Sequence, residues 1–367
     1  MYRWLDKYVG GFLCLFFSFF NLFRKKERSN PCEHILVLKF YEMGCIVLLH
    51  PALSSLRQKY PNAKITFFTI KKNREIVEMT GIPDIILTVD DRNIFLFLYD
   101  VIKNIIRLRN EKIDVLVDLE FLTRFSAIIT FLINAKRSTG FYSDKVFRGN
   151  FYSETVLYQE KKHITEIYKE VFGKLDVTVE YKTPFGLNFE IPEKFKNYSG
   201  KIIAVNINSD TAIIERRWPK NYFVKVIKFL QRTKYKVVLI GSQDDKKYVD
   251  SFVSALENRN IENLAGELSL KQLAGLFKIS KLVISNDSGP LHLAYSMDVP
   301  TVSFFGPETP DIFGPIGDKH TIFYKNLSCS PCVDIYDGKK VRCIHKKIEC
   351  LEQIKPEEVI KKLETIL

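Results

Sequence analysis

The chain has 367 residues, which predicts two domains of about 150 residues each plus shorter segments. Its 55 Lys and Arg residues outnumber the 43 Asp and Glu residues, so the formal net charge is +12. This balance favours anionic partners such as anionic lipid or a phosphorylated substrate, and the absence of a compact basic-aromatic motif excludes nucleic acid.

Residues 1–30 predict a membrane-associating segment. Residues 8–23 form an uncharged apolar run of 16, and a basic cluster follows it at 24–28. A helix that spans a bilayer needs about 20 residues. No small-residue cleavage site follows, which disfavours a cleaved signal peptide. We expect a helix in the inner-leaflet interface with the basic cluster on anionic headgroups, or else a short spanning anchor, and both leave the body of the protein cytoplasmic.

Residues 33–190 predict a first Rossmann-like domain, because strands alternate with helices. The expected strands are 35–39, 64–69, 84–89 and 113–119, and the expected helices are 45–60, 94–110 and 122–135. Such alternation is typical of a parallel, doubly wound sheet. Residues 143–197 mix aromatic and charged side chains and indicate no regular element.

Residues 198–353 repeat the alternation and predict a second Rossmann-like domain. The expected strands are 201–206, 236–240, 281–285 and 301–305, and the expected helices are 219–233, 244–257 and 269–279. Residues 354–367 form a final amphipathic helix that packs against one of the domains. We therefore expect an α/β protein of two Rossmann-like domains that face a central cleft.

Residues 284–310, ISNDSGPLHLAYSMDVPTVSFFGPETP, predict an anion site. A strand ends in the small polar turn Asn286-Asp287-Ser288-Gly289-Pro290, and a helix follows. Asn, Asp and Ser cap helices, Pro suits the first turn, and the free N–H groups of a helix start attract phosphate. A second loop at 305–310 follows the next strand and opens on the same rim of the sheet. The alternative is a well-capped loop without a ligand.

These motifs resemble glycosyltransferase family 9, the bacterial heptosyltransferase group of lipopolysaccharide core assembly. The resemblance rests on ILVLKFYEMGCIVLLHPALSSLRQKYPNAKI, ERRWPKNYF, VVLIGSQDD and the long block NLAGELSLKQLAGLFKISKLVISNDSGPLHLAYSMDVPTVSFFGPETP. It implies a GT-B fold, a nucleotide-diphosphate sugar donor such as ADP-heptose, and inversion at the anomeric carbon without a required cofactor. It also implies an anionic, lipid-linked glycan acceptor at the cytoplasmic face of the bacterial inner membrane.

The donor half of that reaction requires charge stabilisation on the departing phosphate, which a helix N-terminus and a cation can supply. Arg216 stands where the family has a basic residue before Trp218-Pro219, with Arg217 as the alternative and a solvated surface arginine as the other reading. The residues expected to bind donor are Asn206, Ser209, Arg216, Gly241, Ser242, Gln243, Asp287, Ser288, Gly289, Pro290, Leu291 and His292.

The acceptor half requires a general base, usually Asp or Glu. The family carries Asp in the turn after the first strand, where this chain has Cys45. We expect Glu42 to act as the base, so that the catalytic residues are Glu42, Cys45 and Asp287, whose other reading is a helix cap. Lys39 is expected to bind an acceptor phosphate or to be a structural ion pair. A non-catalytic sugar-nucleotide-binding protein and a nucleotide-sugar epimerase are the alternative functions.

Four cysteines near the C-terminus predict a structural zinc site or a set of free thiols. Their spacing resembles that of structural zinc ligands, and a cytoplasmic location disfavours disulfides. The expected metal ligands are Cys329, Cys332, Cys343 and Cys350.

Overall fold

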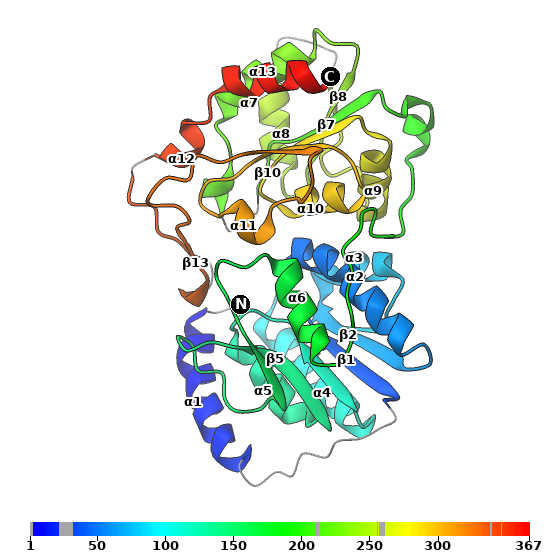
Figure 1. Cartoon of the computed structure of the whole chain (residues 1–367), viewed down its shortest axis with the longest axis vertical. Coiled ribbons are helices and arrows are strands. Elements are labelled where there is room, and N and C mark those ends of the chain that lie inside the picture. The colour runs from blue at the N-terminus through cyan, green and yellow to red at the C-terminus, as the bar shows by residue number, and fades with distance from the viewer. Residues whose placement is uncertain are drawn as a thin grey trace. The chain divides into compact units, whose positions relative to one another are not determined.

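The computed structural model describes residues 3–21, 32–209, 213–254, 256, 261–337, 340–345 and 347–367. The expected basic cluster at 24–28 lies outside these ranges. The chain divides into two compact units. The first runs to Lys182 and also includes a short segment that begins at Ile335, and the second contains Thr183–Asp334 and Lys340–Leu367. Figure 1 shows that each unit is a sheet covered by helices, as the alternation predicted.

The first unit contains a six-stranded parallel sheet in the order β3-β2-β1-β4-β5-β6. Its strands are β1 (His34–Leu38), β2 (Lys64–Ile70), β3 (Ile85–Val89), β4 (Val115–Asp118), β5 (Arg137–Tyr142) and β6 (Glu154–Leu157). Every residue of β1 is buried, as the central strand of a sheet covered on both faces requires. The sequence did not indicate β5 or β6, which complete one edge.

The helices of the first unit are α1 (Arg3–Asn21), α2 (Met43–Lys59), α3 (Arg74–Thr80), α4 (Ile94–Asn110), α5 (Arg124–Ile133) and α6 (Ile164–Gly173). The 3₁₀ turns η1 (Lys71–Asn73) and η4 (Ile335–Asp337) belong to the same unit. The inward side chains of α4 and α5, among them Phe97, Val101 and Ile129, pack into one apolar core with β1, β2, β3 and β4. The two helices therefore cover the same face of the sheet.

Helix α1 is docked on α5. Asp6 accepts hydrogen bonds from the backbone N–H groups of Arg124 and Phe125, at 3.3 and 2.9 Å, and so caps the N-terminus of α5. Phe17 stacks on Phe131 with ring centroids 4.7 Å apart, and Cys14 is fully buried. Within the described part of the chain, no helix combines the length and the apolar character that crossing a membrane would take.

The second unit repeats the same topology in the order β12-β11-β10-β7-β8-β9, again with all six strands parallel. Its strands are β7 (Ile202–Asn206), β8 (Lys236–Leu239), β9 (Ile261–Asn263), β10 (Leu282–Asn286), β11 (Thr301–Phe304) and β12 (His320–Phe323). A small hairpin, β13 (Val333–Asp334) and β14 (Lys340–Val341), lies outside the sheet. The edge strands β9 and β12 were not predicted because each is short and only half-buried.

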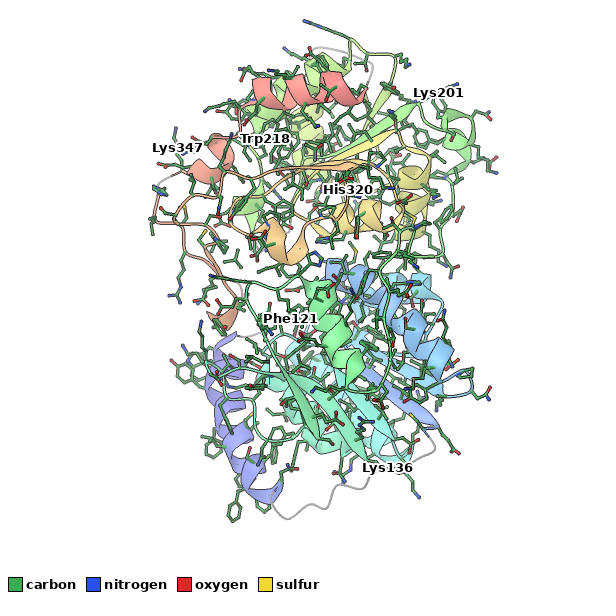
Figure 2. All side chains as sticks on the ribbon, viewed as in Figure 1. Phe121, Lys136, Lys201, Trp218, His320 and Lys347 are labelled. Carbon is green, nitrogen blue, oxygen red and sulfur yellow. The ribbon has the colours of Figure 1, made fainter. Side chains whose placement is uncertain are left out.

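The main helices of the second unit are α7 (Lys220–Leu230), α8 (Lys246–Val253), α9 (Leu270–Ile279), α10 (Gly289–Ser296) and α13 (Pro356–Ile366). The remaining pieces are η2 (Glu193–Tyr198), η3 (Ile214–Arg216), α11 (Pro310–Phe313) and α12 (Glu349–Glu352). Val359 and Leu363 of α13 enter the core of this unit, so the expected packing of the last helix is confirmed. Trp218, labelled in Figure 2, is buried and stacks on Phe304 with ring centroids 4.2 Å apart.

Both sheets have the doubly wound strand order in which the direction of winding reverses beside the first strand. The reversal lies between β1 and β4 in the first unit and between β7 and β10 in the second. Ligands of such sheets bind outside the carboxyl ends of the strands at the reversal. Each unit is therefore expected to present its functional groups there.

Candidate donor-binding and catalytic site

At the reversal in the second unit, buried amides and hydroxyls hold the ends of β7 and β10 together. Asn206 donates from Nδ2 to the hydroxyls of Ser288 and Ser285, at 2.9 and 3.1 Å. Asn286 donates to the carbonyl of Asn208 at 3.0 Å. All of these side chains are buried. Asn206 therefore fixes the shape of the loop. Asn286 of the predicted turn joins it, and so does Asn208, which the sequence did not single out.

The loop leads directly into α10. Ser288 occupies the N-cap position, but its side chain makes no capping hydrogen bond because its hydroxyl belongs to the Asn206 network. Pro290 lies in the first turn, where its missing N–H costs nothing. The positive end of the α10 dipole therefore emerges at the carboxyl end of β10, as the sequence predicted for an anion site.

Arg216 supplies the cation of this site. Its Nε lies 3.2 Å from Oδ2 of Asp287, and its Nη2 lies 3.5 Å from Oε2 of Glu308. The side chains of Asp287 and Glu308 are only 4% and 3% exposed, and that of Arg216 is 13% exposed. Two buried carboxylates thus hold the guanidinium beside the start of α10. A guanidinium has donors on more than one edge, so it can serve carboxylates and a phosphate together.

The neighbouring arginine takes a different direction. Arg217 lies 4.0 Å from Asp245 and places its guanidinium 4.4 Å from the centre of the Tyr248 ring. The structure therefore distinguishes the two candidate cations, and only Arg216 joins Asp287. Trp218 is buried, and Pro219 occupies the N-cap position of α7, so both have structural roles.

Glu308 is a site residue that the sequence did not identify. It lies in the loop after β11, the strand next to β10, and it is 2% exposed. The available signal was its position: the loop at 305–310 was expected on the same rim as residues 284–290. Ligands bind near the carboxyl ends of the strands beside the reversal, so a charged residue in that position, such as Glu308, is a candidate for the site.

The turn after β8 was expected to contact the nucleoside. A Cβ added to Gly241 would lie 2.7 Å from Nδ2 of Asn208, so only glycine fits there. Ser242 donates from its N–H and its hydroxyl to Asp245, at 3.0 and 2.6 Å, and Gln243 is exposed. Ser209 donates its hydroxyl to the carbonyl of Ile213 at 3.0 Å. Gly241 and Ser242 thus shape the turn, and Gln243 is exposed with its side-chain oxygen beside Gly266.

At the reversal in the first unit, Glu42 and Cys45 lie side by side. The thiol of Cys45 donates to Oε2 of Glu42 at 3.0 Å. Glu42 has a left-handed backbone, with φ 70° and ψ 84°, at the N-cap position of α2, and its side chain does not cap that helix. A left-handed conformation of a non-glycine residue costs free energy, and such residues cluster at functional sites. The structure therefore places Glu42, the base expected from the sequence, in hydrogen-bond contact with Cys45, the other expected catalytic residue of this turn.

Lys39 is fully buried, and its Nζ lies 3.2 Å from Oε1 of Glu120 and 4.2 Å from the centre of the Phe121 ring. Burial alone lowers the pKa of Lys39, but the carboxylates of Glu120 and Glu42 outweigh it and raise that pKa. Glu120 also accepts from the N–H of Tyr41 at 2.9 Å. Lys39, just after the end of β1, thus pairs with Glu120, two residues after the end of β4, instead of presenting its charge to solvent. This favours the structural reading over a phosphate-binding one.

The four C-terminal cysteines line a common pocket with His345 and Glu349, and all four are free thiols. Burial and the neighbouring thiols raise the pKa of Cys332 to about 11. Burial also raises the pKa of Cys350 to about 11. Among the residues that the structure describes, no three His, Cys, Asp or Glu side chains lie close enough together to hold a metal ion. The structural zinc site stays a prediction.

Comparison with known sequences now adds to this geometry. Residues 101–341, well over half of the chain, match the profile of glycosyltransferase family 9 (heptosyltransferase). The chain belongs to this family. It is therefore a glycosyltransferase, and the resemblance drawn from its motifs is confirmed.

Relatives in glycosyltransferase family 9 match most of the chain. The lipooligosaccharide heptosyltransferase 2 of Campylobacter jejuni is 23% identical over 332 residues, which cover 89% of this chain and 95% of that protein. The lipopolysaccharide heptosyltransferase 3 of Escherichia coli is 26% identical over 72% of this chain and 79% of its own length.

Solved structures confirm the fold. A family 9 glycosyltransferase from Veillonella parvula superposes with a TM-score of 0.75 at 25% identity, over 92% of this chain and 98% of that one. The E. coli ADP-heptose lipopolysaccharide heptosyltransferase II gives a TM-score of 0.70 at 20% identity, over 91% and 98% of the two chains. The expected α/β fold of GT-B type is thus confirmed.

Proposed function

We propose that this protein transfers heptose from ADP-heptose to the core of lipopolysaccharide or lipooligosaccharide, with inversion at the anomeric carbon. The proposal extends the family assignment, because several relatives are named heptosyltransferases of these two glycans. The observation that carries it is the position of Arg216, which Asp287 and Glu308 hold beside the start of α10.

On the donor side, the bond between the sugar and the diphosphate breaks, and negative charge develops on the departing ADP. Arg216 and the N-terminal dipole of α10 stabilise that charge without a metal ion. Asp287 and Glu308 keep the guanidinium in place before the donor arrives, so little reorganisation accompanies the reaction. The turn at Gly241, Ser242 and Gln243 receives the nucleoside.

On the acceptor side, Glu42 accepts the proton of the attacking hydroxyl. The acceptor oxygen forms its bond to the anomeric carbon on the face opposite the leaving ADP, which inverts the configuration. Cys45 stands where the family carries its usual acid, and its thiol orients the Glu42 carboxylate through the 3.0 Å hydrogen bond. Glu42 is therefore the proposed base and Cys45 the proposed positioning residue.

The acceptor is an anionic, lipid-linked glycan, which places the protein at the cytoplasmic face of the bacterial inner membrane. The net charge of +12 suits such an acceptor. Most side chains on the side of α1 away from α5 are apolar and exposed, which suits a membrane surface.

A screen of nucleotide-sugar donors against the purified protein tests this function, with thermal shift and nucleotide release measured together. We expect ADP-heptose to stabilise the protein and to yield ADP when a heptose-deficient core acceptor is added. The variant R216K keeps the charge but loses the planar fork, so we expect kcat/KM to fall by at least about tenfold. The matched control, R232K, changes an exposed arginine of the same unit and should leave kcat/KM unchanged.

Other results of the screen would replace the proposal. Donor binding without release of ADP in the presence of acceptor would indicate a sugar-nucleotide-binding protein that has lost catalysis. Isomerisation of the donor sugar in the absence of any acceptor would indicate an epimerase. A full response to a different nucleotide sugar, with none to ADP-heptose, would keep the transferase and overturn the assigned donor.

A further inference from the structure

Helix α1 exposes a continuous apolar stripe. Trp4, Tyr8, Phe12, Phe16 and Phe20 recur at every fourth position, and all five side chains are exposed, Phe12 by 66%. The opposite side of the helix packs on α5 through its polar cap at Asp6 and through its buried and stacked side chains. Figure 2 shows the side chains of α1 that project away from the first unit along the whole helix. The stripe therefore belongs to the surface of a docked helix.

Helix α4 exposes a second apolar stripe that the sequence reading did not identify. Phe95, Tyr99, Ile102 and Ile106 follow one another at helical spacing, with Phe95 exposed by 78% and Tyr99 by 62%. Leu96 and Leu98 widen the stripe. The other side of α4 supplies core residues to the sheet, so this helix is apolar on two faces although only one is covered. A helix with two apolar faces requires a second apolar environment.

Helix α5 connects the two stripes. It packs against α1 through Phe131 and against α4 through Phe125, whose ring centroid lies 5.2 Å from that of Phe97. Its half-buried Ile128 and Leu132 are apolar too. Apolar side chains thus run across three neighbouring helices of one unit. Exposed apolar patches on neighbouring helices of this kind mark interaction sites.

The charges and aromatic types around these helices indicate the partner. Lys7 on α1 and Lys103 and Arg109 on α4 are exposed, whereas Arg107 pairs with Glu111 at the end of α4, at 2.7 Å. The acidic residues of the same helices face the protein: Asp6 caps α5, and Asp100 accepts from the N–H of Asp90 at 3.0 Å. Exposed Trp and Tyr beside basic residues are typical of surfaces that lie at the level of lipid headgroups.

We propose that α1, α5 and α4 form one membrane-docking face that inserts its apolar side chains into the interface of an anionic bilayer. The inference rests on the proposed function, which supplies a lipid-linked acceptor, and it assigns α4 a contact that the N-terminal segment alone would not provide. Two helices that insert together fix the tilt of the first unit on the membrane, whereas a single inserted helix leaves the unit free to rotate about the axis of that helix. Helix α4 therefore orients the acceptor-binding unit.

Vesicle binding of the full-length protein tests the proposal without reference to sugar transfer. We expect co-sedimentation with vesicles of phosphatidylglycerol and phosphatidylethanolamine, and weaker binding to phosphatidylcholine vesicles because the basic flank contributes. The variant F95S/I102S removes two exposed side chains of α4 and should lower the partition coefficient by at least about tenfold. The control F189S/I316S removes two exposed side chains of the second unit and should bind like the wild type.

Three results would overturn the proposal: a wild type that fails to bind anionic vesicles, an F95S/I102S variant that binds as well as the wild type, or a control that loses binding equally. If the wild type is a dimer without lipid and F95S/I102S is a monomer, a second copy of the chain covers the face instead. Circular dichroism confirms that the variants are folded. ADP release with a water-soluble acceptor measures sugar transfer without a membrane. A loss of vesicle binding can therefore be distinguished from a loss of the proposed transferase activity.

Discussion

Replacing Glu42 by Gln separates base catalysis from folding. Gln keeps the size of the side chain and an oxygen that can accept from the Cys45 thiol, which lies 3.0 Å from the native carboxylate. Because the Glu42 side chain does not cap α2, the substitution should change the melting temperature little. The amide cannot accept the proton of the acceptor hydroxyl. A general base contributes about 10²- to 10⁴-fold to the rate, so kcat should fall by that factor while KM for the donor changes little.

Three further variants locate the base more closely. E42G relieves the left-handed backbone at φ 70°, so it should raise stability by about 1 kcal/mol while activity is lost. C45S keeps a hydrogen-bond donor beside Glu42 and should retain most of the activity. E42Q/C45D places a carboxylate where the family carries its acid, and it should recover part of the lost turnover.

The assay is steady-state ADP release with saturating ADP-heptose and a heptose-deficient core acceptor. A wild-type turnover rate for E42Q would exclude Glu42 as the base. Loss of donor binding by E42Q in proportion to kcat would exclude it too, because a base acts on the acceptor and not on the donor. A wild-type rate for C45A would keep Glu42 as the base but remove the positioning role of Cys45.

Three other predictions concern stability and metal content. A Cβ at Gly275 would lie 1.9 Å from the carbonyl oxygen of Glu190, so G275A should cost about 1–3 kcal/mol in urea unfolding, whereas G173A, with nothing within 4 Å, should cost nothing. Burial lowers the pKa of His320 from 6.5 to about 4, so the unfolded chain binds the extra proton first as the pH falls. The free energy of unfolding should therefore decrease as the pH falls from 6.5 to about 4, by about 1–2 kcal/mol after solvent screening. H320Q should remove that decrease. Parallel pH profiles of stability for the two proteins would contradict this prediction. Elemental analysis decides between a zinc site and free thiols at the four C-terminal cysteines: about one zinc per chain, lost in C329S/C332S, would support the zinc site, whereas four thiols reactive without metal would exclude it.

Much of the fold could be predicted from the sequence because buried strands and amphipathic helices have local periods. The runs Ile35–Leu38 and Leu282–Ile284 are apolar throughout. They lie in the first strand of one sheet and in the strand across the reversal in the other. Edge strands such as β9 and β12 are short and half-buried, so their pattern is too weak to detect. Helix α4 was predicted as a helix but its exposed apolar face was not, because an apolar residue counts towards a helix whether it is buried or exposed.

The sequence by itself determined the doubly wound class and the family, and it predicted an anion site in the loop at 284–310, since each depends on residues adjacent in the chain. Only the tertiary structure decided which cation joins that loop, because Arg216 and Arg217 are neighbours in sequence and diverge in space. It also added Glu308 to the site and paired Lys39 with Glu120, 81 residues away. Such ion pairs depend on which strands end side by side. That order follows from the packing of the whole sheet and is not encoded in any local stretch.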